Sequence, residues 1–136
     1  MKKYLLSVVG VLVACVAVDF VVHGILLHQA YMDTASLWRP EAEMSIPLIH
    51  LGTLISVMCF VWIYDRLVTA KSCNTATKYG LVWGIAVGCG MSICTYAVMP
   101  IPMSMAMTWL AGALVEWTIG GAIMGWAYSC TDSKQG

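Results

Sequence analysis

The chain has 136 residues, of which 60% are hydrophobic and 10% are charged, and its formal net charge is zero. A soluble domain carries about 25% charged residues, so this composition excludes a soluble globular protein and predicts an integral membrane protein whose partner is the lipid bilayer. The few basic residues are scattered along the sequence, which argues against a nucleic-acid partner.

The first apolar stretch covers residues 4–27 and follows two lysines, as a signal peptide would. Residues 12–15 resemble a lipoprotein cleavage box, which would make Cys15 a lipidation site. The apolar character continues well beyond Cys15, however, and the full length suits a membrane span of about 20 residues. We therefore expect an uncleaved helix, while lipidation of Cys15 stays open.

Three further apolar stretches predict spans at residues 47–64, 79–98 and 103–128. Ser45 is the expected N-cap of the first of these, with Pro47 in its first turn. Pro100 and Pro102 exclude a continuous helix between the last two spans and predict a tight turn. The predicted fold class is therefore all-α, a four-transmembrane-helix bundle in a single membrane domain of residues 1–136.

Basic residues indicate how these spans are oriented. Arg39 lies on one side of the predicted topology, and the other six lie on the opposite side: Lys2, Lys3, Arg66, Lys71, Lys78 and Lys134. By the positive-inside rule both termini are cytoplasmic, and the loop at residues 28–45 faces outward.

Small residues recur at helical spacing in the third span, at Gly80, Gly84 and Gly88. Such spacing lets helix backbones approach closely in lipid. This face is expected to pack within the bundle. The alternative is that it joins the chain to a homo-oligomer or to a larger membrane complex.

Four ionisable side chains interrupt the predicted spans. Asp19 and His23 lie in the first span, His50 lies in the second and Glu116 lies in the fourth. Charged groups are costly in hydrocarbon, so such residues usually face the bundle interior and mark a function. With a rise of about 1.5 Å per residue, all four lie in the outer half of the membrane or near its midplane. We expect them to form one outward-facing polar pocket.

A second polar layer follows in the outer loop. Tyr31, Arg39 and Glu43 are expected to roof the pocket, with Arg39 paired to a loop glutamate or reaching towards Asp19. The simpler alternative is a solvated loop held by a salt bridge at its rim.

Two segments carry a resemblance to a known group of proteins. They are Asp19-Phe20-Val21-Val22-His23-Gly24 and Leu37-Trp38-Arg39-Pro40-Glu41-Ala42-Glu43-Met44. With the Pro100-Ile101-Pro102 turn and the helix of Glu116, they resemble an uncharacterised family of small bacterial four-span inner-membrane proteins. The resemblance implies a multi-pass protein of the bacterial inner membrane, and it implies no activity.

Several functions are compatible with the predicted pocket. Two imidazoles and two carboxylates (Asp19, His23, His50 and Glu116) suit a divalent metal ion, and the same groups are usual parts of proton relays. The predicted function is therefore binding of a cation or conduction of protons. One alternative is a structural or accessory membrane subunit in which buried polar pairs only fix helix packing. A further alternative is b-type haem held by His23 and His50, which lie at similar depths.

Catalysis has no support from any motif. The sequence contains no nucleophile elbow, phosphate loop or zinc-protease signature. Methionines near the outer edge offer thioether ligands for copper, but methionine is also an ordinary filler of apolar packing.

Overall fold

The computed structural model describes residues 1–132, with side chains up to Ser129, and every regular element in this range is helical. Residue Lys134, used above for orientation, lies outside the described residues. The elements in chain order are α1 (Lys2–Asp19), the π-helical segment η1 (Phe20–Leu26), α2 (His28–Asp33), the short 3-10 helices η2 (Ala35–Leu37) and η3 (Glu41–Glu43), α3 (Ile46–Leu67), α4 (Cys73–Val98) and α5 (Met103–Asp132).

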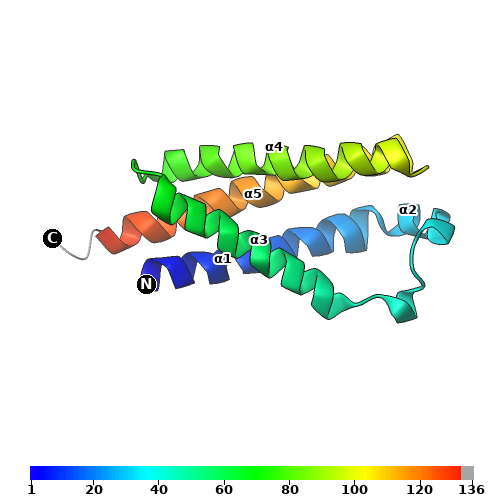
Figure 1. The fold of residues 1–136 in the computed structure, drawn as a ribbon, viewed down its shortest axis with the longest axis horizontal. Helices are drawn as coiled ribbons and strands as arrows, with labels where there is room; N and C mark the ends of the chain where they lie inside the picture. Colours follow the sequence, from blue (N-terminus) through cyan, green and yellow to red (C-terminus); the bar gives the residue numbers. More distant parts are fainter. Residues whose placement is uncertain (133–136) are drawn as a thin grey trace.

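Four helical stretches in the described part are long and apolar enough to cross a membrane: Lys2–Leu26, Ile46–Leu67, Cys73–Val98 and Met103–Ser129. The prediction of an all-α protein is confirmed, and these four helical stretches have the length and apolar character that membrane spans require. The start of α1, the α3–α4 loop and the end of α5 lie at one end of the molecule, and α2 lies with the α4–α5 turn at the other (Figure 1).

Several helix boundaries differ by a few residues from the predicted spans, and two of these differences have a clear origin in polar residues. α4 begins at Cys73 rather than at residue 79, because Ser72 caps it by accepting a hydrogen bond from the Thr75 backbone N–H at 3.0 Å. α3 continues through a polar last turn to Leu67 rather than ending at residue 64. Both extensions are polar, so hydropathy alone does not detect them. Ser45 is the N-cap position of α3 as predicted, although its side chain makes no capping hydrogen bond.

Close packing of α4 on α5 uses the predicted glycine face. A Cβ atom on Gly80 would overlap the Trp117 carbonyl oxygen, and one on Gly84 would lie 2.8 Å from the Ala113 carbonyl oxygen. Gly80, Gly84 and Gly88 are all buried. The prediction that this face packs within the chain is confirmed. The face is covered by α5 and is not free for a second copy in this arrangement.

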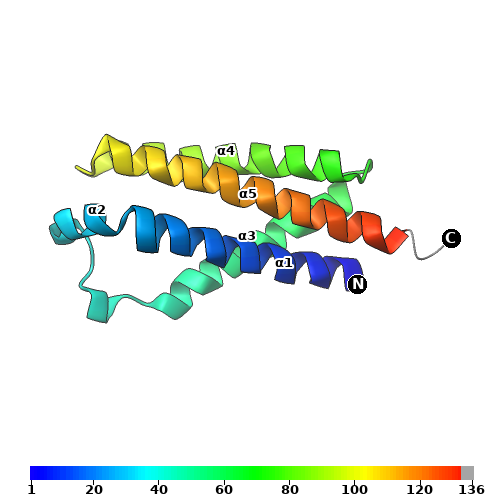
Figure 2. The same cartoon turned by 180° about the vertical axis from the view of Figure 1, so that it is seen from behind.

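α5 lies between α4 and α1, whereas α3 crosses α1 at an angle and its first turns point away from the other helices (Figures 1 and 2). As a result, residues 41–52 are exposed. The larger apolar cluster lies where α3 meets the other helices, and its buried side chains include Val11, Val57, Phe60, Tyr64 and Trp117. A smaller cluster at the α2 end packs Val22 and Leu27 against α5. The polar residues of the first span lie between these two clusters.

Candidate functional site

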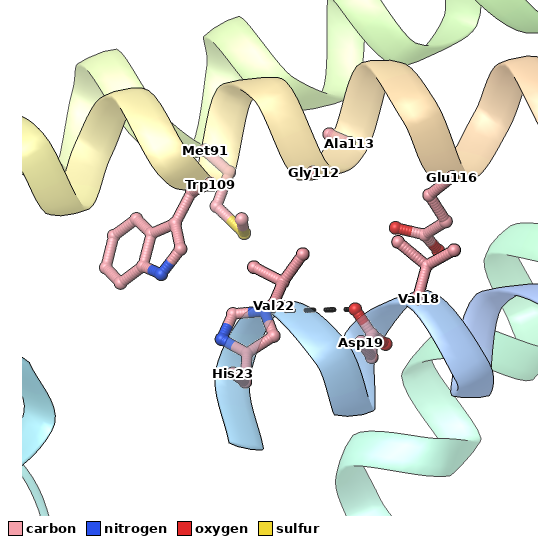
Figure 3. Close-up of a pocket in the computed structure, with 9 residues that line it drawn as sticks. All are labelled: Val18, Asp19, Val22, His23, Met91, Trp109, Gly112, Ala113 and Glu116. Carbon is pink, nitrogen blue, oxygen red and sulfur yellow. Dashed lines mark ion pairs between the residues drawn. The ribbon is translucent and has the colours of Figure 1, made fainter. Parts of the chain in front are cut away.

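A small pocket of about 30 Å³ lies between α1 and α5 (Figure 3). We call it the α1–α5 pocket, and its lining residues are Val18, Asp19, Val22, His23, Met91, Trp109, Gly112, Ala113 and Glu116. A water molecule needs roughly 10–15 Å³ measured in this way, so the pocket has room for one or two waters or a small ion. Three of its lining side chains are ionisable, and the others are mostly apolar.

Asp19 and His23 share one face of the first span, as their spacing predicts. The His23 Nε2 atom lies 3.8 Å from an Asp19 carboxylate oxygen, and about 40% of each side chain is exposed (Figure 3). This separation is longer than a direct hydrogen bond, so a charged pair here interacts through space or through one water. The pair forms part of the wall that α1 and η1 contribute to the pocket.

Glu116 enters the same pocket from the opposite helix. It lies one turn beyond Gly112 on α5, and Gly112 packs against Val22 so closely that an added Cβ atom would lie 2.9 Å from a Val22 methyl carbon. This close approach lets the two helices bring their carboxylates together. The Glu116 carboxylate interacts electrostatically with Asp19 and also with the thiol of the buried Cys15.

His50 does not line the pocket, because the first turns of α3 diverge from α1. Its side chain is exposed, and it interacts with Asp19 only electrostatically. Of the four predicted residues, three therefore line one cavity and His50 stands outside it. Among the described residues, no group of three or more His, Cys, Asp or Glu side chains is gathered closely enough to hold a metal ion. The haem alternative meets two obstacles, since His50 is outside and the cavity is far smaller than a typical cofactor site of about 300 Å³ or more.

The backbone around His23 is π-helical, which the sequence analysis did not predict. The Leu27 backbone N–H donates to the Val22 carbonyl oxygen at 2.9 Å, five residues back. Short π-helical insertions occur frequently at functional sites. Here the segment ends the first span and turns the chain into α2, which brings Tyr31 back over His23.

Tyr31 connects the loop to the pocket. Its hydroxyl oxygen lies 2.6 Å from His23 Nδ1 and accepts a hydrogen bond from Trp109 Nε1 at 2.9 Å. Its ring also stacks on the His23 ring and packs edge-on against Trp38. Tyr31 was predicted as part of a roof and does contact a lining residue. Arg39 and Glu43, the other two roof residues, are exposed, and within the described residues Arg39 makes no ion pair.

Two residues at the site were missed by sequence reasoning. Trp109 was not among the predicted site residues, yet its side chain is buried and lines the pocket. Its spacing to Gly112 and Glu116 places all three on one helical face, and that signal was available. Cys15 was considered only as a lipidation site, and nothing in the sequence indicated that its buried thiol on α1 interacts with Glu116 on α5.

Comparisons with protein-family models, curated protein sequences and solved structures find no match for this chain.

Proposed function

We propose that this small multi-pass membrane protein reversibly binds a proton in the α1–α5 pocket, through Asp19, His23 and Glu116. The observation that carries the proposal is the convergence of two carboxylates and an imidazole, from two different helices, on one water-sized cavity. Two charged carboxylates in an apolar setting repel each other, and a shared proton removes that repulsion. Ionisable residues inside membrane spans are the usual parts of proton-handling sites.

A proton fits this pocket better than a metal ion or haem does. Metal sites in proteins need three or four ligands at fixed short distances, and His50 is not in place to complete such a set. Reversible protonation needs only titratable groups and, at most, one bridging water. The cavity volume of about 30 Å³ satisfies that requirement.

Proton binding is favoured over proton conduction because the half of the bundle between the pocket and the start of α1 is tightly packed. Val11, Cys15, Val57 and Phe60 are fully buried between the pocket and the end of the molecule where α1 begins. We further propose that this packed end is cytoplasmic, from the distribution of basic residues, and that the membrane is the bacterial inner membrane.

The test is infrared difference spectroscopy of the purified protein across a pH change. A protonated carboxylic acid has a carbonyl stretch that is distinct from both carboxylate and amide bands. Glu116→Gln is expected to remove a pH-dependent carboxylic acid band that the wild type shows. Glu41→Gln is the matched control, since Glu41 is exposed in the loop, and it should leave that band unchanged.

A purely structural role for the same residues is the competing proposal. It is favoured if Glu116→Gln lowers the free energy of unfolding but leaves the infrared band in place. If liposomes that contain the protein show a proton flux that Glu116→Gln abolishes, proton conduction replaces proton binding as the function of the pocket.

A further inference from the structure

Three polar groups from three elements form a continuous hydrogen-bonded series beside the pocket, on the side of α2. Trp109 of α5 contacts Tyr31 of α2, and Tyr31 contacts His23 of η1, with donor–acceptor distances of 2.9 Å and 2.6 Å. Beyond His23, on the other side of the imidazole ring, lies Asp19. The series therefore leads from a buried indole to the carboxylate of the pocket.

The chemistry of these groups fixes the direction of each bond. An indole N–H can only donate, so the Tyr31 oxygen accepts from Trp109. The Tyr31 hydroxyl proton is then free to be donated to His23 Nδ1. A neutral imidazole that accepts at Nδ1 carries its own proton at Nε2. Nε2 is the atom that faces Asp19 at 3.8 Å.

We propose that Tyr31 is a positioning residue of the pocket, which holds His23 in the Nε2–H tautomer and thereby directs the imidazole N–H at Asp19. This inference rests on the proposed function, because the orientation of the His23 N–H has a consequence only if Asp19 takes part in proton binding. The inference follows from the geometry of the three hydrogen-bonded groups. It assigns a role in the pocket to Tyr31 of α2, which does not itself line the cavity.

Two features suit Tyr31 to this role. Burial raises the pKa of its phenol above the usual value, so the hydroxyl keeps its proton over the physiological range and remains a donor. Its ring is also held on both sides, by stacking on His23 at 5.9 Å and by an edge-on contact with Trp38 at 5.5 Å between ring centroids. A hydroxyl fixed in this way selects one tautomer of the imidazole, as groups hydrogen-bonded to the far nitrogen of a metal-binding histidine do.

The inference is tested by ¹⁵N NMR of the full-length protein in micelles, at a pH where histidine is neutral. The chain has three histidines, so His28→Gln and His50→Gln assign the ring nitrogens of His23. The expected result for the wild type is a single Nε2–H tautomer with an unprotonated Nδ1. In Tyr31→Phe the ratio of the Nε2–H tautomer to the Nδ1–H tautomer should fall by on the order of tenfold, because the hydrogen bond from the Tyr31 hydroxyl to Nδ1 is lost.

Tyr96→Phe is the matched control, because Tyr96 is exposed on α4 away from the series. It should leave the His23 spectrum unchanged. An Nδ1–H tautomer or an even mixture in the wild type overturns the inference, and so does an unchanged ratio in Tyr31→Phe. If Tyr31→Phe does not fold, the wild-type spectrum alone tests the inference, because an Nδ1–H tautomer or an even mixture there overturns it. Because no carboxyl group is observed, failure of this inference is distinguishable from failure of proton binding, which the infrared experiment reports separately.

Discussion

Gly80 of α4 lies so close to Trp117 of α5 that an added Cβ atom would overlap the Trp117 carbonyl oxygen. The helix backbones meet at this point without intervening side chains, which is how small residues drive association in lipid. The contact also determines where α5 presents Glu116, the neighbour of Trp117 in the chain.

Replacement of Gly80 tests this contact. Gly80→Ala is expected to lower the free energy of unfolding by about 1–3 kcal/mol, because a methyl group forced against backbone atoms must displace a helix. Gly90→Ala, on the same helix, should have little effect or stabilise by up to about 1 kcal/mol, since nothing lies within 4 Å of its added carbon. Unfolding in micelles by titration with a denaturing detergent measures both. Equal losses in the two variants would contradict the packing described.

A second contact joins α5 to the end of α3. The Tyr128 hydroxyl donates to the Asp65 carboxylate at 2.6 Å, and Asp65 also pairs with Arg66 at 3.3 Å. Hydrogen bonds to charged groups contribute about 1.5–3 kcal/mol, and Asp65 is partly exposed, so Tyr128→Phe should cost about 1–2 kcal/mol. The double-mutant cycle with Asp65→Asn isolates the interaction. A coupling energy near zero would show that the two groups do not stabilise the fold through this bond.

The buried phenol of Tyr31 predicts a dependence of stability on alkaline pH. Its raised pKa means that the folded protein binds the phenolic proton more tightly than the unfolded chain does. The stabilisation is therefore fully present below about pH 10 and is lost as the pH rises above that value towards the folded-state pKa. Tyr31→Phe should reduce this loss relative to the wild type. Unfolding free energies measured at neutral and alkaline pH test the difference, and parallel curves for the two proteins would contradict it.

Much of the fold was predictable from hydropathy and turn chemistry. The α4–α5 turn followed from Pro100 and Pro102, and the start of α5 at Met103 agrees with the predicted span. The polar first turns of α4 were not detected, because the capping of Ser72 onto Thr75 adds helix outside the apolar window. The divergence of α3 at its first turns was also not predictable, since it depends on how the helices cross and not on their composition.

The site was predicted in part, for reasons that differ between residues. Asp19 and His23 share a face because of their spacing along one helix, which sequence specifies. The position of His50 depends on the crossing of α3 over α1, which sequence spacing does not specify. The π-helical segment has no simple sequence signature, yet it brings Tyr31 to His23. Spacing along a single helix was therefore a sound guide, whereas contacts between helices required the structure.

Proton binding at the pocket is tested most directly by the carboxyl ¹³C resonance of Glu116. The chain has three glutamates, at positions 41, 43 and 116, so selective labelling gives three resonances, and Glu116→Gln identifies the one of interest. If Asp19 and Glu116 share a proton site, Asp19→Asn shifts the pH range over which the Glu116 resonance titrates and leaves Glu41 and Glu43 unchanged. A Glu116 resonance whose titration is the same with and without the Asp19 carboxylate would contradict the proposal.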